Sequence, residues 1–199
     1  MNYLAHLYLA GAEPHTLIGS LLGDFAKGRI DPTWPPPVRQ AVIQHRRVDA
    51  FTDSHPIVNR SKQRLGAELR RYAGILVDVY YDHLLARDWS RYALTPLRTF
   101  VNRVYAVLRA HYASFPLPMQ RSVSYLLAHD LLHSYRDIRG IQRALEGIAG
   151  RLRRTNPIAQ AITVLEREDA GLAADFAVFF PELTARFRAD AVWEFAALG

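Results

Sequence analysis

The sequence predicts an all-α protein, a single-domain helical bundle over residues 1–199. Three observations carry this prediction. Apolar residues recur at the spacing of helical faces, the alternation typical of strands is scarce, and no linker, repeat or low-complexity tract divides the chain. With 199 residues, half of them hydrophobic, the chain is long enough to bury one sizeable core.

The individual helices follow from their apolar faces and from the prolines between them. Over 15–27, Leu17, Leu21 and Phe25 share one face, although the glycines of this segment weaken a helix. The DPTWPPP stretch at 31–37 stops any helix. Further helices are expected over 38–52, 57–70, 73–89, 97–112, 119–135 and 138–151, with a last one from 157 to the C-terminus that is interrupted near Pro181.

Composition limits the classes of partner and the location. The net charge of +6 comes from arginine, since only Lys27 and Lys62 are lysines, and it suits nucleic acid, a phosphorylated ligand or an acidic protein. The chain has no cysteine, which excludes disulfides and thiolate ligands. The N-terminal stretch lacks a basic n-region, and no apolar run approaches ~18 residues. We therefore expect no signal peptide, no membrane span and a cytoplasmic location.

Histidines and acidic residues concentrate on apolar helical faces in the first 83 residues. Charged carboxylates are costly to bury unless they are paired or bind a metal. Several that converge with imidazoles indicate a site for a hard or borderline divalent cation. The seven residues are His6, Asp24, His45, Asp49, Asp78, Asp82 and His83.

Two pairs in this set have the spacing of one helical turn. His45 and Asp49 can chelate one cation, with a surface ion pair as the alternative. Asp78 and Asp82 lie four residues apart in a buried helix, where they repel unless a cation or a proton separates them, or unless Arg71 or Arg87 pairs with them. Asp24 lies on the apolar stripe of its segment. It is expected to cap a nearby helix N-terminus, to pair with a buried arginine, or to bind a metal.

The segment 128–137 contains a literal His-Asp dyad, His129-Asp130, with His133 one turn further on. Such a dyad suits an HD-type phosphohydrolase, but a two-residue string is weak evidence. A glycine-rich phosphate loop, a nucleophile elbow and a cysteine nucleophile are all missing from the sequence. A metal-activated water is therefore the expected means of hydrolysis.

Five stretches together resemble the acyl carrier protein phosphodiesterase family: MNYLAHLYLA, GSLLGDFAKG, HRRVDAFTDSHP, RRYAGILVDVYYDHLLARDW and the later YRD. The resemblance implies an all-helical, HD-like fold and dependence on Mn²⁺, with Mg²⁺ or another divalent cation as alternatives. It implies hydrolysis of holo-acyl carrier protein, an acidic partner, to the apo protein and 4′-phosphopantetheine. The His129-Asp130 dyad lies outside the matched stretches. Within them the adjacent acidic residue and histidine are Asp82-His83, so the His-Asp order of the HD superfamily is reversed.

The resemblance implies ligand or catalytic roles for all seven residues of the set. We expect a metal at His6, Asp24, His45, Asp49, Asp78 and Asp82. Asp24, His83 and Arg46 are the expected catalytic residues, and Arg46, Arg47, Arg70, Arg71 and Arg136 the expected contacts to phosphate or to the carrier. The alternatives are an HD-type nucleotide phosphohydrolase and a basic helical module that binds nucleic acid.

Overall fold

The structure, a computed structural model, describes residues 1–152 and 154–188, and this part of the chain contains helices and loops but no strand. The all-α prediction is thus confirmed. The α-helices are α1 (Tyr3–Leu9), α2 (Pro14–Leu22), α3 (Pro36–Ser54), α4 (Pro56–Arg64), α5 (Ala73–Arg87), α6 (Leu97–Ala110), α7 (Leu117–Ala128), α8 (Leu131–Ser134), α9 (Ile138–Arg151), α10 (Ile162–Arg167) and α11 (Asp169–Phe187). Short 3-10 turns, Trp89–Arg91, Tyr112–Ser114 and Ala159–Ala161, join some of them.

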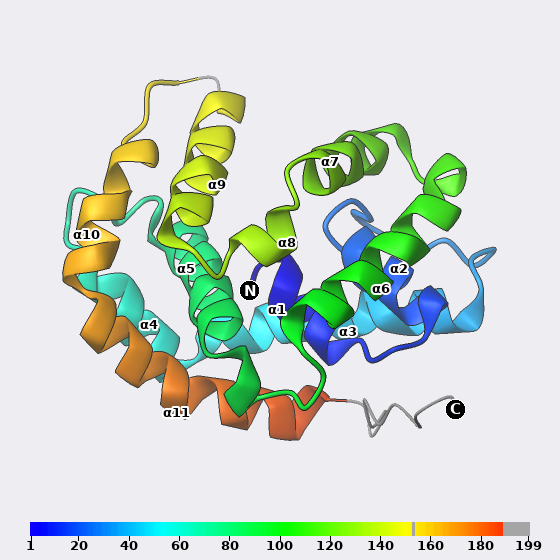
Figure 1. Ribbon diagram of the computed structural model, residues 1–199, viewed down its shortest axis with the longest axis horizontal. Coiled ribbons are helices and arrows are strands. Elements are labelled where there is room, and N and C mark those ends of the chain that lie inside the picture. Colours follow the sequence, from blue (N-terminus) through cyan, green and yellow to red (C-terminus); the bar gives the residue numbers. More distant parts are fainter. Residues whose placement is uncertain (153, 189–199) are drawn as a thin grey trace.

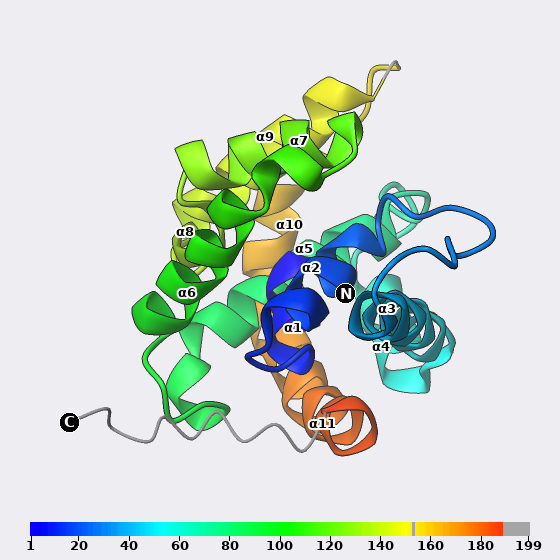
Figure 2. The same ribbon diagram turned by 90° about the vertical axis from the view of Figure 1, so that its right-hand side faces the viewer.

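The short helix α1 lies at the centre of the molecule (Figure 1). All its residues except Tyr3 are buried, and it packs against α2 on one side and α5 on the other. A helix that is apolar on every side has to be covered on every side. The same holds for α5, whose buried residues include Leu76, Tyr80 and Leu84. In Figures 1 and 2, α11 runs beside α4 along one edge of the molecule, and the two helices pack together.

Several helix boundaries differ from the predicted ones. The helix expected over 57–70 ends at Arg64, and α1 was not predicted. α2 ends at Leu22, so Asp24 lies in the turn that follows and not on a helical stripe. The helix expected over 119–135 breaks at His129-Asp130, where Asp130 adopts a left-handed conformation with φ of 46°.

The predicted interruption at Pro181 is wrong, because α11 continues through it. Phe179, Phe180 and Leu183 are fully buried on both sides of the proline, and this packing offsets the backbone hydrogen bond that proline cannot make. The chain instead breaks at Glu168, between α10 and α11. Residues 189–199 of the last predicted helix lie outside the described residues.

Within the described residues, no helix combines the length and the apolar character needed to span a bilayer.

A buried carboxylate joins α11 to α4. Asp175, fully buried, accepts hydrogen bonds from Nε of Arg60 (2.9 Å), Nε of Arg64 (2.9 Å) and Oγ of Ser61 (2.8 Å). Burial alone would raise the pKa of Asp175, but the hydrogen bonds from Arg64, Arg60 and Ser61 outweigh it and lower the pKa. The ionised form of Asp175 therefore stabilises the packing of these helices.

Replacing Asp175 with Asn should lower the free energy of unfolding by about 2 kcal/mol at neutral pH, since charge-assisted hydrogen bonds are lost. Because the folded pKa lies below the unfolded one, this stability is present above about pH 3.9 and fades as the pH falls through the folded pKa. Urea unfolding at about pH 7 and pH 3 measures both effects. Asp53→Asn, which breaks an exposed pair with Lys62, should cost under about 0.5 kcal/mol. A loss for Asp175→Asn that is equal at both pH values would contradict this account.

Candidate metal centre

Two glycines let α2 lie directly against α3. Gly19 and Gly23 face α3 one turn apart, and a Cβ atom at Gly19 would collide with the carbonyl oxygen of Val38. At Gly23 it would collide with Cγ of His45. Only hydrogen fits at either position. The backbone of α2 therefore packs on the imidazole of His45.

The orientation of His45 is set by one backbone carbonyl. The side chain is buried, and its Nδ1 donates a hydrogen bond to the carbonyl oxygen of Ser20 at 2.7 Å. Its Nε2 faces two carboxylates, Oδ2 of Asp49 at 3.2 Å and Oδ1 of Asp24 at 3.6 Å. Burial alone would lower the pKa of His45, but these carboxylates outweigh it and raise the pKa. Nε2 is therefore placed to bind a cation, whether a proton or a metal.

His6 adds a second imidazole from α1. Its ring stacks on that of His45, with centroids 3.8 Å apart and planes 13° from parallel, and its Nε2 lies 3.0 Å from Oδ1 of Asp49. Oγ of Ser20 donates to the carbonyl oxygen of His6 at 2.9 Å, so Ser20 fixes both histidines. Burial lowers the pKa of His6 to about 4, which keeps its imidazole neutral at pH 7.

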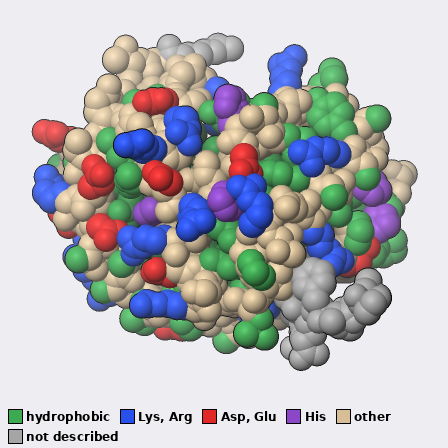
Figure 3. All heavy atoms as spheres, viewed as in Figure 1, with side chains coloured by type: hydrophobic (Ala, Val, Ile, Leu, Met, Phe, Trp, Pro, Cys, Tyr) green, Lys and Arg blue, Asp and Glu red, His purple; other side chains and the backbone are tan. Residues whose placement is uncertain are grey.

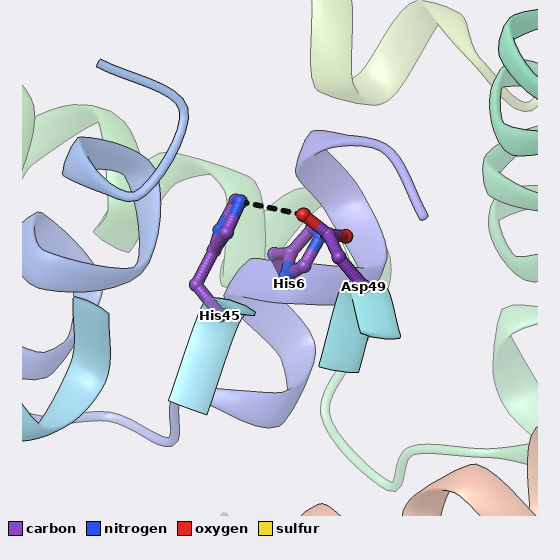
Figure 4. A group of neighbouring side chains, drawn as sticks. All are labelled: His6, His45 and Asp49. Atoms are coloured by element: carbon purple, nitrogen blue, oxygen red, sulfur yellow. Dashed lines mark hydrogen bonds and ion pairs between the residues drawn. The ribbon is translucent and has the colours of Figure 1, made fainter. Parts of the chain in front are cut away.

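The ligand atoms of His6, His45 and Asp49 all lie within 4.8 Å of one another (Figure 4). Burial would raise the pKa of Asp49, but hydrogen bonds with His45 and His6 hold it well below its usual range. Both histidines are buried, whereas the Asp49 side chain is 42% exposed, so solvent reaches the group on the Asp49 side. Two imidazoles and an ionised carboxylate form a donor set for a borderline divalent cation.

Two further predicted ligands lie at the rim of this group. The Asp24 side chain is 43% exposed beside His45, and partial burial raises its pKa. Oδ1 of Asp78 lies 3.2 Å from the buried amino group of Met1, which is also 3.6 Å from Oδ1 of Asp49. Burial raises the pKa of Asp78 even though this ammonium lowers it. The structure thus separates Asp78 from Asp49 by a positive charge.

Asp82 has a different place from the predicted one. It is fully buried, and its two oxygens accept hydrogen bonds from the backbone N–H groups of Leu4 (2.7 Å) and Ala5 (3.0 Å). These are unpaired donors of the first turn of α1, so Asp82 caps that helix from α5. Burial raises the pKa of Asp82 to about 7. Asp82 lies outside the three-residue group, with both oxygens engaged by the backbone.

His83 also lies apart from the group. Its Nδ1 donates to the carbonyl oxygen of Tyr135 at 2.7 Å, and its ring packs 5.2 Å from that of Tyr80. Burial lowers its pKa. The structure therefore gives His83 a contact between α5 and the segment after α8, and does not bring it to His6, His45 or Asp49.

The predicted arginines are spread over the molecule. Arg46 donates to the carbonyl oxygen of Ala26 and so holds the loop that carries Asp24. Arg47 lies over the ring of Phe187, 6.0 Å from its centroid. Arg70 and Arg71 are exposed before α5, and Arg136 is exposed after α8. Of these, Arg46 is the one with a hydrogen bond to the loop that borders the candidate metal centre.

Asp130 of the His129-Asp130 dyad, and His133 beside it, contact Arg98. Oδ2 of Asp130 lies 2.8 Å from Arg98, and the same guanidinium lies 2.5 Å from Nδ1 of His133. Within the described residues, the group that could hold a metal is His6, His45 and Asp49.

The sequence did not predict the roles of Ser20 and Gly23. The spacing of the two glycines in GSLLG, one helical turn, is a signal of close helix packing that could have indicated them.

The chain is similar to known proteins along nearly its whole length. The family model described as acyl carrier protein phosphodiesterase matches residues 1–183. A protein of that name from Salmonella paratyphi A is 34% identical over 187 residues, 94% of this chain and 97% of the relative. Another from Yersinia pestis is 32% identical over 186 residues, 92% and 95% of the two chains. No solved structure matches the chain.

Replacing Gly23 with Ala should weaken Mn²⁺ binding by at least ~10-fold, because the added methyl group displaces His45 from its hydrogen bond to Ser20. Isothermal titration calorimetry measures the affinity, and circular dichroism checks that the helices remain. Gly74→Ala is the matched control, since a Cβ there meets only Lys62 at 4.0 Å. An unchanged affinity in folded Gly23→Ala protein would refute this role of the glycine.

Proposed function

The chain belongs to the acyl carrier protein phosphodiesterase family, a family of phosphodiester hydrolases, and from this premise we propose that it hydrolyses holo-acyl carrier protein to the apo protein and 4′-phosphopantetheine. The observation that carries the proposal is the group of His6, His45 and Asp49. A phosphodiester needs an activated water and neutralisation of charge on phosphorus, and this group is suited to both. With this substrate, we propose that the protein acts in the cytoplasm.

His6, His45 and Asp49 are proposed to hold one divalent cation, Mn²⁺ by resemblance to the family. The residues fit a metal because His6 is neutral, Asp49 is ionised and Nε2 of His45 points at the shared carboxylate. When bound, such a cation lowers the pKa of a coordinated water and neutralises a phosphoryl oxygen. The carbonyl of Ser20 keeps the donor nitrogen of His45 turned to the site.

Asp24 is proposed as the general base. Its carboxylate is half exposed beside His45, and its raised pKa makes it a better proton acceptor than an ordinary aspartate. In the proposed step Asp24 takes a proton from the attacking water, whose oxygen forms a bond to phosphorus. The bond from phosphorus to the carrier serine breaks, and the serine oxygen takes up a proton. Arg46 positions Asp24 by holding its loop at Ala26.

The alternative of a nucleic-acid-binding module has less support. Such a module is expected to carry a basic patch or stripe. On the face in Figure 3, Lys and Arg side chains are interspersed with Asp and Glu. A nucleotide phosphohydrolase would use the same metal chemistry, and family membership favours the carrier protein as substrate.

Incubating the protein with holo-acyl carrier protein and Mn²⁺ should convert the carrier to its apo form. Intact-mass spectrometry measures this as loss of the 4′-phosphopantetheine mass. A chelator should stop the reaction and added Mn²⁺ should restore it. Asp24→Ala should reduce turnover by about 100-fold or more, while His129→Ala, which removes an exposed imidazole, should leave it within about 2-fold. If the carrier keeps its mass after incubation with folded, metal-loaded protein, the proposed function is refuted.

Exposed arginines are proposed to steer the acidic carrier to the site. Reversing the charge at Arg70 and Arg71, both exposed, should lower kcat/KM for the carrier at low salt. The same variant should leave kcat/KM for a small phosphodiester unchanged. For the wild type, kcat/KM for the carrier should fall as the Debye length shrinks from ~10 Å at 0.1 M salt to ~3 Å at 1 M. Equal salt dependence for both substrates would contradict steering.

A further inference from the structure

We propose that a groove between α7 and α9 binds the pantetheine arm of the substrate, an inference that rests on the proposed function. The groove is a cavity of about 470 Å³. Its lining includes Arg121, Ser122 and Tyr125 of α7, Gly147 and Arg151 of α9, and Phe25 from the turn after α2. Cavities of this size accommodate small organic ligands.

The groove begins beside the metal centre. Phe25, which lines it, directly follows Asp24, and Asp24 lies 3.6 Å from Nε2 of His45. Tyr3 lies one helical turn before His6 and connects the two regions. Burial and the charge of Asp24 raise the pKa of the Tyr3 hydroxyl, while Arg151 and a hydrogen bond with Ser122 lower it, so the hydroxyl interacts with Asp24 and with two residues of the groove lining. A ligand with its phosphate at the metal centre can therefore extend into the groove.

The lining matches the chemistry of the arm. Pantetheine is an uncharged chain of two amides, methylene groups and a geminal dimethyl group. Phe25 and Tyr125 offer apolar surface to the aliphatic parts. The Ser122 hydroxyl and the guanidinium of Arg151 are donors for the amide carbonyls. These groups provide orientation without requiring charge on the ligand.

Gly147 keeps the groove open. A Cβ atom there would lie 3.1 Å from the hydroxyl oxygen of Tyr125, on the opposite wall. A larger side chain would fill the space between α9 and α7. On the same helix, a Cβ at Gly150 would meet nothing within 4 Å. The two glycines therefore form a matched pair for testing the groove.

The test compares Gly147→Leu with Gly150→Leu on three substrates. They are holo-acyl carrier protein, a short uncharged peptide with a phosphopantetheinyl serine, and bis(p-nitrophenyl) phosphate, which has no arm. Leucine favours a helix more than glycine does, so both variants should fold, and circular dichroism checks this. We expect Gly147→Leu to raise KM for both arm-bearing substrates by about 10-fold or more. Its effect on bis(p-nitrophenyl) phosphate, and every effect of Gly150→Leu, should stay within about 2-fold.

Two kinetic outcomes would overturn the proposal. One is unchanged KM values in Gly147→Leu. The other is a higher KM for the carrier but not for the peptide, which would show that the groove contacts the carrier surface instead of the arm. Direct binding of pantetheine, which lacks the phosphate, separates this proposal from the proposed function. Binding to the wild type that is lost in Gly147→Leu supports the groove even if no carrier is cleaved, and no binding to the wild type refutes it.

Discussion

The contact of α2 with α3 at Gly19 and Gly23 is the constraint on which the candidate metal centre depends. Because neither glycine has a side chain, the backbone of α2 reaches the ring of His45, and the carbonyl of Ser20 comes within 2.7 Å of Nδ1. Ser20 also binds the backbone of His6 through its hydroxyl. One turn of α2 thus sets the positions of both imidazoles. Asp49 completes the group simply by lying one turn after His45 on α3.

A second constraint acts through α1. This helix has seven residues, too few to be stable alone, and it holds His6. Asp82 stabilises its first turn by accepting the N–H groups of Leu4 and Ala5. Leaving those buried donors unpaired would cost about 1–3 kcal/mol each. Asp82, which the sequence predicted to be a metal ligand, therefore acts on the site indirectly, by keeping α1 and its histidine in place.

The sequence predicted features that depend on neighbouring residues, but not those that depend on contacts between distant parts of the chain. Helical periodicity was enough to predict α3 and α5, and the one-turn spacing of His45 and Asp49 was enough to place both on one face. Asp82 meets α1 across 78 positions of the chain, so nothing near it distinguishes a cap from a ligand. The stop of α2 at Leu22, which moves Asp24 into a turn, likewise depends on packing that periodicity does not contain.

Locating the metal directly is the most decisive measurement. Anomalous diffraction from crystals grown with Mn²⁺ would show where the ion binds. The account predicts a peak in coordination contact with Nε2 of His6, Nε2 of His45 and the carboxylate of Asp49. A peak at His129, Asp130 or His133 with none at this group would contradict it.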